Sequence, residues 1–164
     1  NKDIKIIIKL KDQHAKNKSN ISHLNFLNQA IKKYSAGAKI TNIEVESEKS
    51  SIDILKISDV VCGMQSTTLM EAALMKKPVI LTHFDSLINQ HSSDEALIYY
   101  KSQKMFFIPR NKNEFNKIVL NKLANPFVTK KMYNLQKKYF NEHISFLDAS
   151  ASKKTLKLIN AFTK

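Results

Sequence analysis

Hydrophobic and polar positions along the chain follow two different periods. Residues 4–10 form a short, β-branched and nearly continuous apolar run, which is typical of a strand covered on both faces of a parallel sheet. Residues 21–34 instead carry apolar side chains three or four positions apart, the spacing of one helix face. The pattern predicts strands at residues 4–10, 38–45, 59–62, 78–81 and 105–109, and helices at residues 21–34, 50–57, 66–75, 93–102, 114–123, 128–141 and 152–162. We expect Ser50 or Ser51, and Asn113, to cap two of these helices.

Strand and helix alternate about five times, an order typical of βαβ units. We therefore expect an α/β fold, a Rossmann-like three-layer sandwich with a mostly parallel sheet of about five or six strands and helices on both faces. A single domain of this kind would account for residues 1–164. In such folds ligands bind at the carboxyl ends of the strands, so the residues that follow each strand are the candidates for function.

The charge of the chain is strongly positive, with 27 basic and 14 acidic side chains and a net charge of +13. Only Arg110 is an arginine, and arginine is the side chain that best matches base edges and phosphates in a bidentate way. This composition argues against nucleic acid as a partner. Ten basic side chains and one acidic side chain fall within residues 101–140. That segment is either a set of solvated helix faces or a surface that meets an anionic membrane.

Small residue counts exclude several kinds of site. Cys62 is the single cysteine, so the chain has no internal disulfide and no zinc site built of cysteines. We expect Cys62 to be a small buried hydrophobe and the protein to work in a reducing compartment, the cytoplasm or the inner face of its membrane. Two glycines, Gly37 and Gly63, are too few for a Walker loop or a three-glycine dinucleotide motif. The histidines show no metal-ligand spacing, so no bound metal is expected.

The segment after the third predicted strand carries the most informative pattern. A strand leads to Gly63, and Ser66, Thr67 and Thr68 then open a helix. A helix N-terminus offers unpaired N–H groups and a partial positive charge, and hydroxyl groups add donors, so this segment suits a diphosphate. Glu71 lies one turn further on much the same side, where its carboxylate can accept from ribose hydroxyls. Thr68 and Glu71 also match a capping box, which leaves a structural role open.

The same segment resembles the donor-binding half of GT-B glycosyltransferases and their nucleotide-sugar relatives. These relatives include the UDP-N-acetylglucosamine 2-epimerase-like proteins, the lipid A disaccharide synthases and the CDP-glycerol-type transferases. The resemblance is specific over residues 57–84 and loosely collinear over residues 4–163. The residues that match are Asp59, Gly63, Ser66, Thr67, Glu71, Ala72, Lys77 and Pro78.

The resemblance implies roles for individual residues. The donor phosphates would be held by Gly63, Gln65, Ser66, Thr67 and Thr68, and the ribose by Glu71. The nucleobase would meet backbone groups near residues 43–45. A phosphate or sugar contact would come from the turn after the first strand, from Lys9, Lys11 or His14. His83 follows the fourth predicted strand, so by position it is a further candidate for the cleft. No catalytic residue is assigned.

The resemblance implies a glycosyltransferase of bacterial surface-polysaccharide or lipopolysaccharide synthesis. Its substrate would be a UDP-, CMP- or CDP-linked sugar, with no cofactor. Nothing in residues 1–164 matches the amino-terminal acceptor domain of that family, so we expect the chain to be the carboxyl-terminal half, inactive alone. Two alternatives stay open: half of a nucleotide-sugar epimerase of the same fold, or a non-catalytic basic module that binds nucleic acid or membrane.

Overall fold

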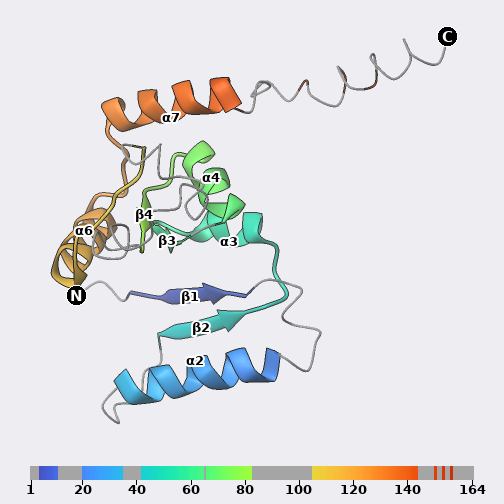
Figure 1. Cartoon of the computed structure of the whole chain (residues 1–164), viewed down its shortest axis with the longest axis vertical. Coiled ribbons are helices and arrows are strands. Elements are labelled where there is room, and N and C mark those ends of the chain that lie inside the picture. The colour runs from blue at the N-terminus through green and yellow to red at the C-terminus, as the bar shows by residue number, and fades with distance from the viewer. Residues whose placement is uncertain are drawn as a thin grey trace, which may run out of the picture. The chain divides into compact units, whose positions relative to one another are not determined.

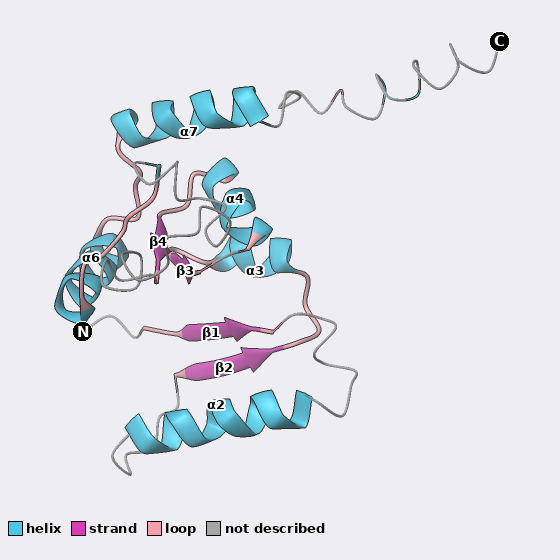
Figure 2. Cartoon of the chain, viewed as in Figure 1, coloured by secondary structure: helices cyan, strands magenta, loops and turns pink. Residues whose placement is uncertain are grey.

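The computed structural model of the protein describes residues 4–10, 20–34, 42–64, 66–82 and 105–143, together with residues 150, 153 and 156. These residues form helices and short parallel strand pairs, so the prediction of an α/β fold is confirmed (Figure 2). The chain divides into two compact units, Asn1–Ile57 and Ser58–Lys164, and each is described by itself.

The first unit contains a parallel strand pair. Strand β1 (Ile6–Lys9) lies beside β2 (Ile43–Glu46), and helix α2 (Asn20–Tyr34) falls between them in the chain. All three overlap the predicted elements, with bounds that differ by one or two residues over the described ranges. Ile6 is 44% exposed, so the expectation that the first strand is covered on both faces is wrong. In the described structure β1 pairs with one strand, β2.

Helix α3 (Ser51–Ile57) follows β2 and also belongs to the first unit. Its start is a reciprocal cap, as predicted for Ser50. The Ser50 hydroxyl accepts the N–H of Asp53 at 3.1 Å, and the hydroxyl donates to the Asp53 carboxylate at 2.7 Å. Ile54 and Leu55 are the buried residues of this short helix.

The second unit is built on a βαβ unit. Strand β3 (Val61–Gly63) leads into helix α4 (Thr67–Leu74) and then into strand β4 (Val79–Leu81), which pairs in parallel with β3. Phe107 lies on the other side of β4. Its N–H donates to the Val79 carbonyl and its carbonyl accepts the Leu81 N–H, both at 2.9 Å. The predicted strand at residues 105–109 is thus a single parallel bridge in the described structure.

Strand β4 is central to this unit: it has neighbours along both of its edges, and it is buried at every position. Helices α4 and α6 (Lys112–Ala124) lie on opposite sides of it (Figure 1), and both contact it. The buried apolar side chains of the unit come from α4, β4, the segment of residues 105–107 (the Phe107 segment) and the last described helix: Leu69, Ala72, Ala73, Val79, Ile80, Leu81, Met105, Phe106 and Phe140.

The last two described helices are α6 and α7 (Lys130–His143). The N-cap of α6 is Asn111, whose side chain accepts the N–H of Glu114 at 2.9 Å, so the prediction of Asn113 as the cap is wrong. The Glu114 carboxylate accepts the N–H of Arg110 at 2.7 Å, which holds the chain at the helix start two residues earlier than expected. Gln136 connects helix α7 to the core, because its side-chain amide donates to the Met105 carbonyl.

Two expected helices lie wholly or mostly outside the described residues, at 93–102 and 152–162. Of the second, residues 153 and 156 are described, and both are helical. Within the described ranges there are four strands in two small sheets, and the sheet of five or six strands stays a prediction. Among these residues, none of the helices combines the length and apolar character needed to cross a bilayer.

Candidate functional site

The start of α4 follows the carboxyl end of β3 directly. Ser66 is the N-cap, with φ −161° and ψ 140°, and its hydroxyl oxygen accepts the N–H of Thr68 at 3.2 Å. The Ser66 carbonyl accepts the N–H of Leu69 at 3.1 Å. The sequence therefore places this helix start where the motif predicts it, at the ligand-binding edge of a parallel pair.

These caps decide which donors remain for an anion. The N–H groups of Thr68 and Leu69 are both engaged by Ser66. The Thr67 N–H and the two threonine hydroxyls make no hydrogen bond among the described residues, and Thr67 is exposed. An anion would thus meet Thr67 first, and it would reach the Thr68 N–H by replacing the Ser66 hydroxyl.

Glu71 is not part of a capping box. The cap is Ser66 and Thr68 lies inside the helix, so the alternative that pairs Thr68 with Glu71 is wrong. Glu71 is half-buried, and its carboxylate makes no hydrogen bond or ion pair in the part of the chain that the structure describes. It follows Thr67 by four residues and Thr68 by three, which places all three on one side of α4.

Gly63 acts through its lack of a side chain, inside the strand. The sequence suggested a sharp turn at this glycine, but Gly63 is the last residue of β3. A Cβ built on it would lie 3.0 Å from Cδ2 of Leu69, a buried α4 side chain. The glycine therefore lets α4 pack closely against β3 at the edge where the site lies.

Thr82 belongs to this edge, and the sequence reasoning did not single it out. Its N–H donates to the Gly63 carbonyl at 2.9 Å, which ties the end of β4 to the end of β3. The rule that residues after parallel strands face the ligand edge would have found it, since Thr82 directly follows β4.

Lys9 lies in the first unit, at the carboxyl end of β1 beside Glu46 of β2. Its ammonium group donates to the Ser47 carbonyl at 3.1 Å. Glu46 closes the end of β2: its carboxylate accepts the N–H groups of Glu48 and Lys49 and pairs with the Lys49 ammonium at 3.1 Å. These bonds, first that from the Lys49 backbone, lower the pKa of Glu46 to about 2. An ionised carboxylate therefore lies at the end of β2, next to residues 43–45, the predicted contact of the nucleobase.

Four of the predicted contacts, Lys11, His14, Gln65 and His83, lie outside the described residues. The structure brings together Gly63, Ser66, Thr67, Thr68 and Glu71 in the second unit and describes Lys9 in the first.

Cys62 is exposed, so the prediction that it is a buried hydrophobe is wrong. Side chains alternate along a strand, and Gly63 faces α4, so Cys62 projects from the face that α4 does not cover. The surrounding protein still desolvates the thiol and raises its pKa to about 11. The neutral thiol is therefore a poor nucleophile.

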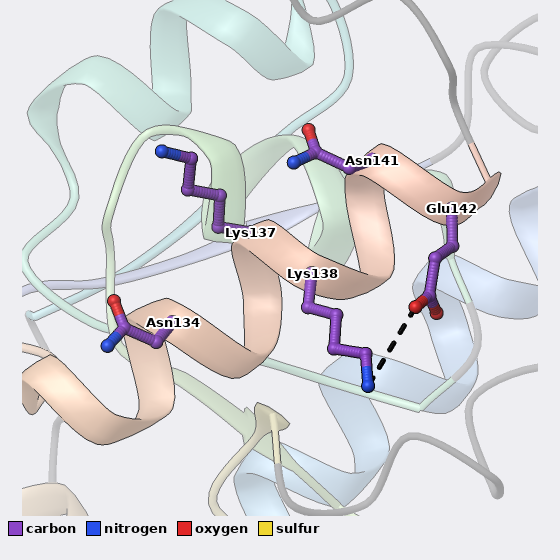
Figure 3. A pocket seen from close by; sticks show the side chains of 5 residues that line it. All are labelled: Asn134, Lys137, Lys138, Asn141 and Glu142. Carbon is purple, nitrogen blue, oxygen red and sulfur yellow. Dashed lines mark ion pairs between the residues drawn. The ribbon is translucent and has the colours of Figure 1, made fainter.

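A cavity of about 370 Å³ opens elsewhere, on helix α7 (Figure 3). Its described lining consists of polar side chains from one face of this helix, with an ion pair of 3.9 Å between Lys138 and Glu142: Asn134, Lys137, Lys138, Asn141 and Glu142. None of the residues predicted to hold the donor is among them. In the described ranges, no group of three or more His, Cys, Asp and Glu side chains is placed to hold a metal ion.

Comparison of the chain with family models, with curated proteins and with solved structures finds no match. The assignment of a function thus depends on the residues at the β3–α4 junction.

Proposed function

We propose that this chain is the donor nucleotide-sugar-binding domain of a GT-B glycosyltransferase of surface-polysaccharide or lipopolysaccharide synthesis. In the whole enzyme a second, amino-terminal domain would bind the acceptor, and this half would be inactive by itself. The complete domain would be a three-layer sandwich with a sheet of five or six strands, located on the cytoplasmic side of the membrane.

The single observation that carries the proposal is the arrangement at the start of α4. A serine-capped helix begins at the carboxyl edge of a parallel strand pair, and the Glu71 carboxylate, which has no partner among the described residues, lies one turn along the same side. Helix N–H groups and threonine hydroxyls suit the diphosphate of a UDP- or CDP-linked sugar. A carboxylate at this depth suits a ribose, whose paired hydroxyls are donors.

The chemistry of this site would be electrostatic. Departure of the nucleotide leaves negative charge on the diphosphate, and fixed donors at the Thr67–Thr68 end of α4 would stabilise that charge. The donors in this scheme are backbone N–H groups and hydroxyls, and neither a metal ion nor the abundant lysines have a role in it.

The test is calorimetric titration of the chain with UDP, CMP, CDP and GDP. We expect one of them to bind with micromolar to millimolar affinity, and Glu71→Gln to weaken that binding about tenfold, since a hydrogen bond to a charged group is lost. Glu142→Gln on α7 is the matched control and should bind as the unchanged chain does. A folded chain that binds none of the four nucleotides would refute the proposal, as would equal losses in the two variants.

A further inference from the structure

The loop between α6 and α7 presents an aromatic side chain to solvent. Phe127 is 73% exposed, the highest value among the large apolar side chains of the described residues. A single exposed apolar residue is ordinary on a protein surface. What distinguishes Phe127 is the way its backbone is held and the charge that surrounds it.

The backbone of Phe127 is hydrogen-bonded at both of its polar groups. Its N–H donates to the Asn125 carbonyl at 2.8 Å, and its carbonyl accepts the Lys122 ammonium at 3.1 Å. The same ammonium lies 4.8 Å from the centroid of the Phe107 ring, which belongs to the core segment beside β4. Lys122 therefore links the loop to the body of the unit, and the exposed ring is held there by the fold.

Positive charge follows the ring directly. Lys130 and Lys131 are both exposed and open helix α7, and the wider segment of residues 101–140 contains ten basic side chains and one acidic one. Glu114, that one acidic residue, is already engaged by Arg110 at 3.0 Å. The segment that contains the loop therefore carries a net positive charge, and Lys130 and Lys131 follow the apolar ring by three and four residues.

We propose that the loop patch, defined as Phe127 with Lys130 and Lys131, docks this unit on an anionic lipid bilayer. The ring enters the boundary between headgroups and acyl chains, and the two ammonium groups stay among the phosphates. A bilayer fits better than a nucleic acid, because the patch has one ring without a polar group and its charges are lysines. Nucleic-acid surfaces use several stacking rings and arginine forks. The proposal is independent of nucleotide binding at α4.

The test is co-sedimentation of the chain with vesicles of pure phosphatidylcholine and of phosphatidylcholine with 30% phosphatidylglycerol. We expect binding to the anionic vesicles only, weakened at high salt. Phe127→Ala should lower the partition coefficient about tenfold, since the buried ring is lost. The double variant Lys130→Ala with Lys131→Ala should lower the partition coefficient of the unchanged chain about fivefold for each lysine removed.

Helix α2 offers matched controls in the other unit. Phe26 is 72% exposed, almost as much as Phe127, and Lys32 and Lys33 are adjacent exposed lysines. Phe26→Ala, and Lys32→Ala with Lys33→Ala, should leave binding unchanged. Equal binding to neutral vesicles, or equal losses in both sets of variants, would overturn the proposal. It would also be overturned if the loop-patch variants lost binding to a single-stranded RNA while their binding to vesicles was unaffected.

A tryptophan supplies a second readout, because the chain contains none. In Phe127→Trp the emission should shift to the blue on adding anionic vesicles, and lipids brominated in their acyl chains should quench it. Phe26→Trp should show neither change. A Phe127→Trp signal that does not respond to anionic vesicles contradicts insertion of the loop patch, whatever the sedimentation result.

Discussion

Gly63 leaves room for the Leu69 side chain across the β3–α4 junction: a Cβ on Gly63 would lie 3.0 Å from the Leu69 Cδ2. Leu69 is 2% exposed, so its side chain has little room to move away. Gly63 is the last residue of the strand, and Leu69 lies in the first turn of the helix that would hold the donor phosphates. Their close approach therefore sets how tightly this helix packs against the strand at the candidate site.

Gly63→Ala should lower the free energy of unfolding by about 1 kcal/mol, since overpacking of a tight core contact has a cost of this order. The atom that meets the new methyl group is the end of a side chain, so the cost is at the low end. Urea unfolding measures it. In a Leu69→Val background Gly63→Ala should cost less, and an undiminished cost there would place the strain elsewhere.

Ser66 has two separable roles at the start of α4, as a cap and as a neighbour of the proposed phosphates. Ser66→Ala should cost about 1 kcal/mol of stability, because the Thr68 N–H loses its acceptor. Ser66→Asp should keep the cap, since aspartate is an equally good N-cap residue. Its negative charge should nevertheless abolish nucleotide binding. Thermal unfolding and calorimetry report the two effects, and full nucleotide binding by Ser66→Asp would contradict a phosphate seat at this helix.

The end of α4 contains a residue in the left-handed region. Lys76 has φ 59°, and the N–H groups of Lys76 and Lys77 donate to the carbonyls of Ala73 and Ala72, both at 2.9 Å. This is a Schellman cap with lysine where glycine is usual. Lys76→Gly should therefore be more stable than Lys76→Ala by about 1 kcal/mol, because a Cβ is costly in this conformation. Both variants remove the lysine side chain, so chemical denaturation isolates the backbone effect. Equal stabilities would contradict it.

The ammonium of Lys76 lies 5.2 Å from the centroid of the Tyr133 ring on α7. That contact is lost in both Lys76 variants, so it cancels in their comparison. A double-mutant cycle of Lys76→Ala with Tyr133→Leu should give a coupling of about 0.5 kcal/mol, the size of an exposed cation–π contact.

Gln136 fastens α7 to the core. It is 1% exposed, its Nε2 donates to the Met105 carbonyl at 2.8 Å, and its Oε1 is buried without a partner. Gln136→Ala should cost about 2–3 kcal/mol, since it leaves a cavity and an unpaired carbonyl. Gln136→Met should cost less, because it fills the space and removes the unpaired oxygen. Comparing urea midpoints tests this order, and a Gln136→Met variant no more stable than Gln136→Ala would contradict it.

The pH dependence of the first unit should follow Glu46. Its pKa is about 2 in the folded chain, below the ordinary value of 4.5. A lowered carboxylate pKa stabilises the fold fully above the unfolded value, and the contribution is lost as the pH falls from about 4.5 towards 2. Glu46→Gln should thus lower stability at pH 7 and flatten its decline between pH 5 and 3. Glu48→Gln is the control, since the Glu48 side chain takes no part in the turn, and an equal flattening in it would contradict the assignment.

The local pattern of the sequence was sufficient to locate α2, α3, α4 and β4, and Ser50 as one of two candidate caps of α3. It placed Ser66 inside α4 and not at its cap. The Ser50 cap forms between near neighbours, so a short stretch of sequence contains it. The same holds for the position of Glu71 relative to the threonines, because helix geometry places residues three and four apart on one side.

Other features depend on which elements lie beside one another. The single bridge at Phe107 and the exposure of Cys62 follow from which strands pair and from which face of β3 is covered by α4. The close packing of α4 on β3 also explains why residue 63 is a glycine. The hydrophobic pattern of the sequence does not show these contacts. The cap of α6 is different, because its bonds are local: Asn111 accepts from Glu114, and Glu114 accepts from Arg110. The choice of Asn113 was thus an error within a local window. By itself the sequence determined the order of the α/β elements and the hydroxyl-rich start of α4, through short-range hydrogen bonds and periodicity. Tertiary structure alone decided which strand is central and which faces stay open, because burial is set by contacts between residues far apart in the chain.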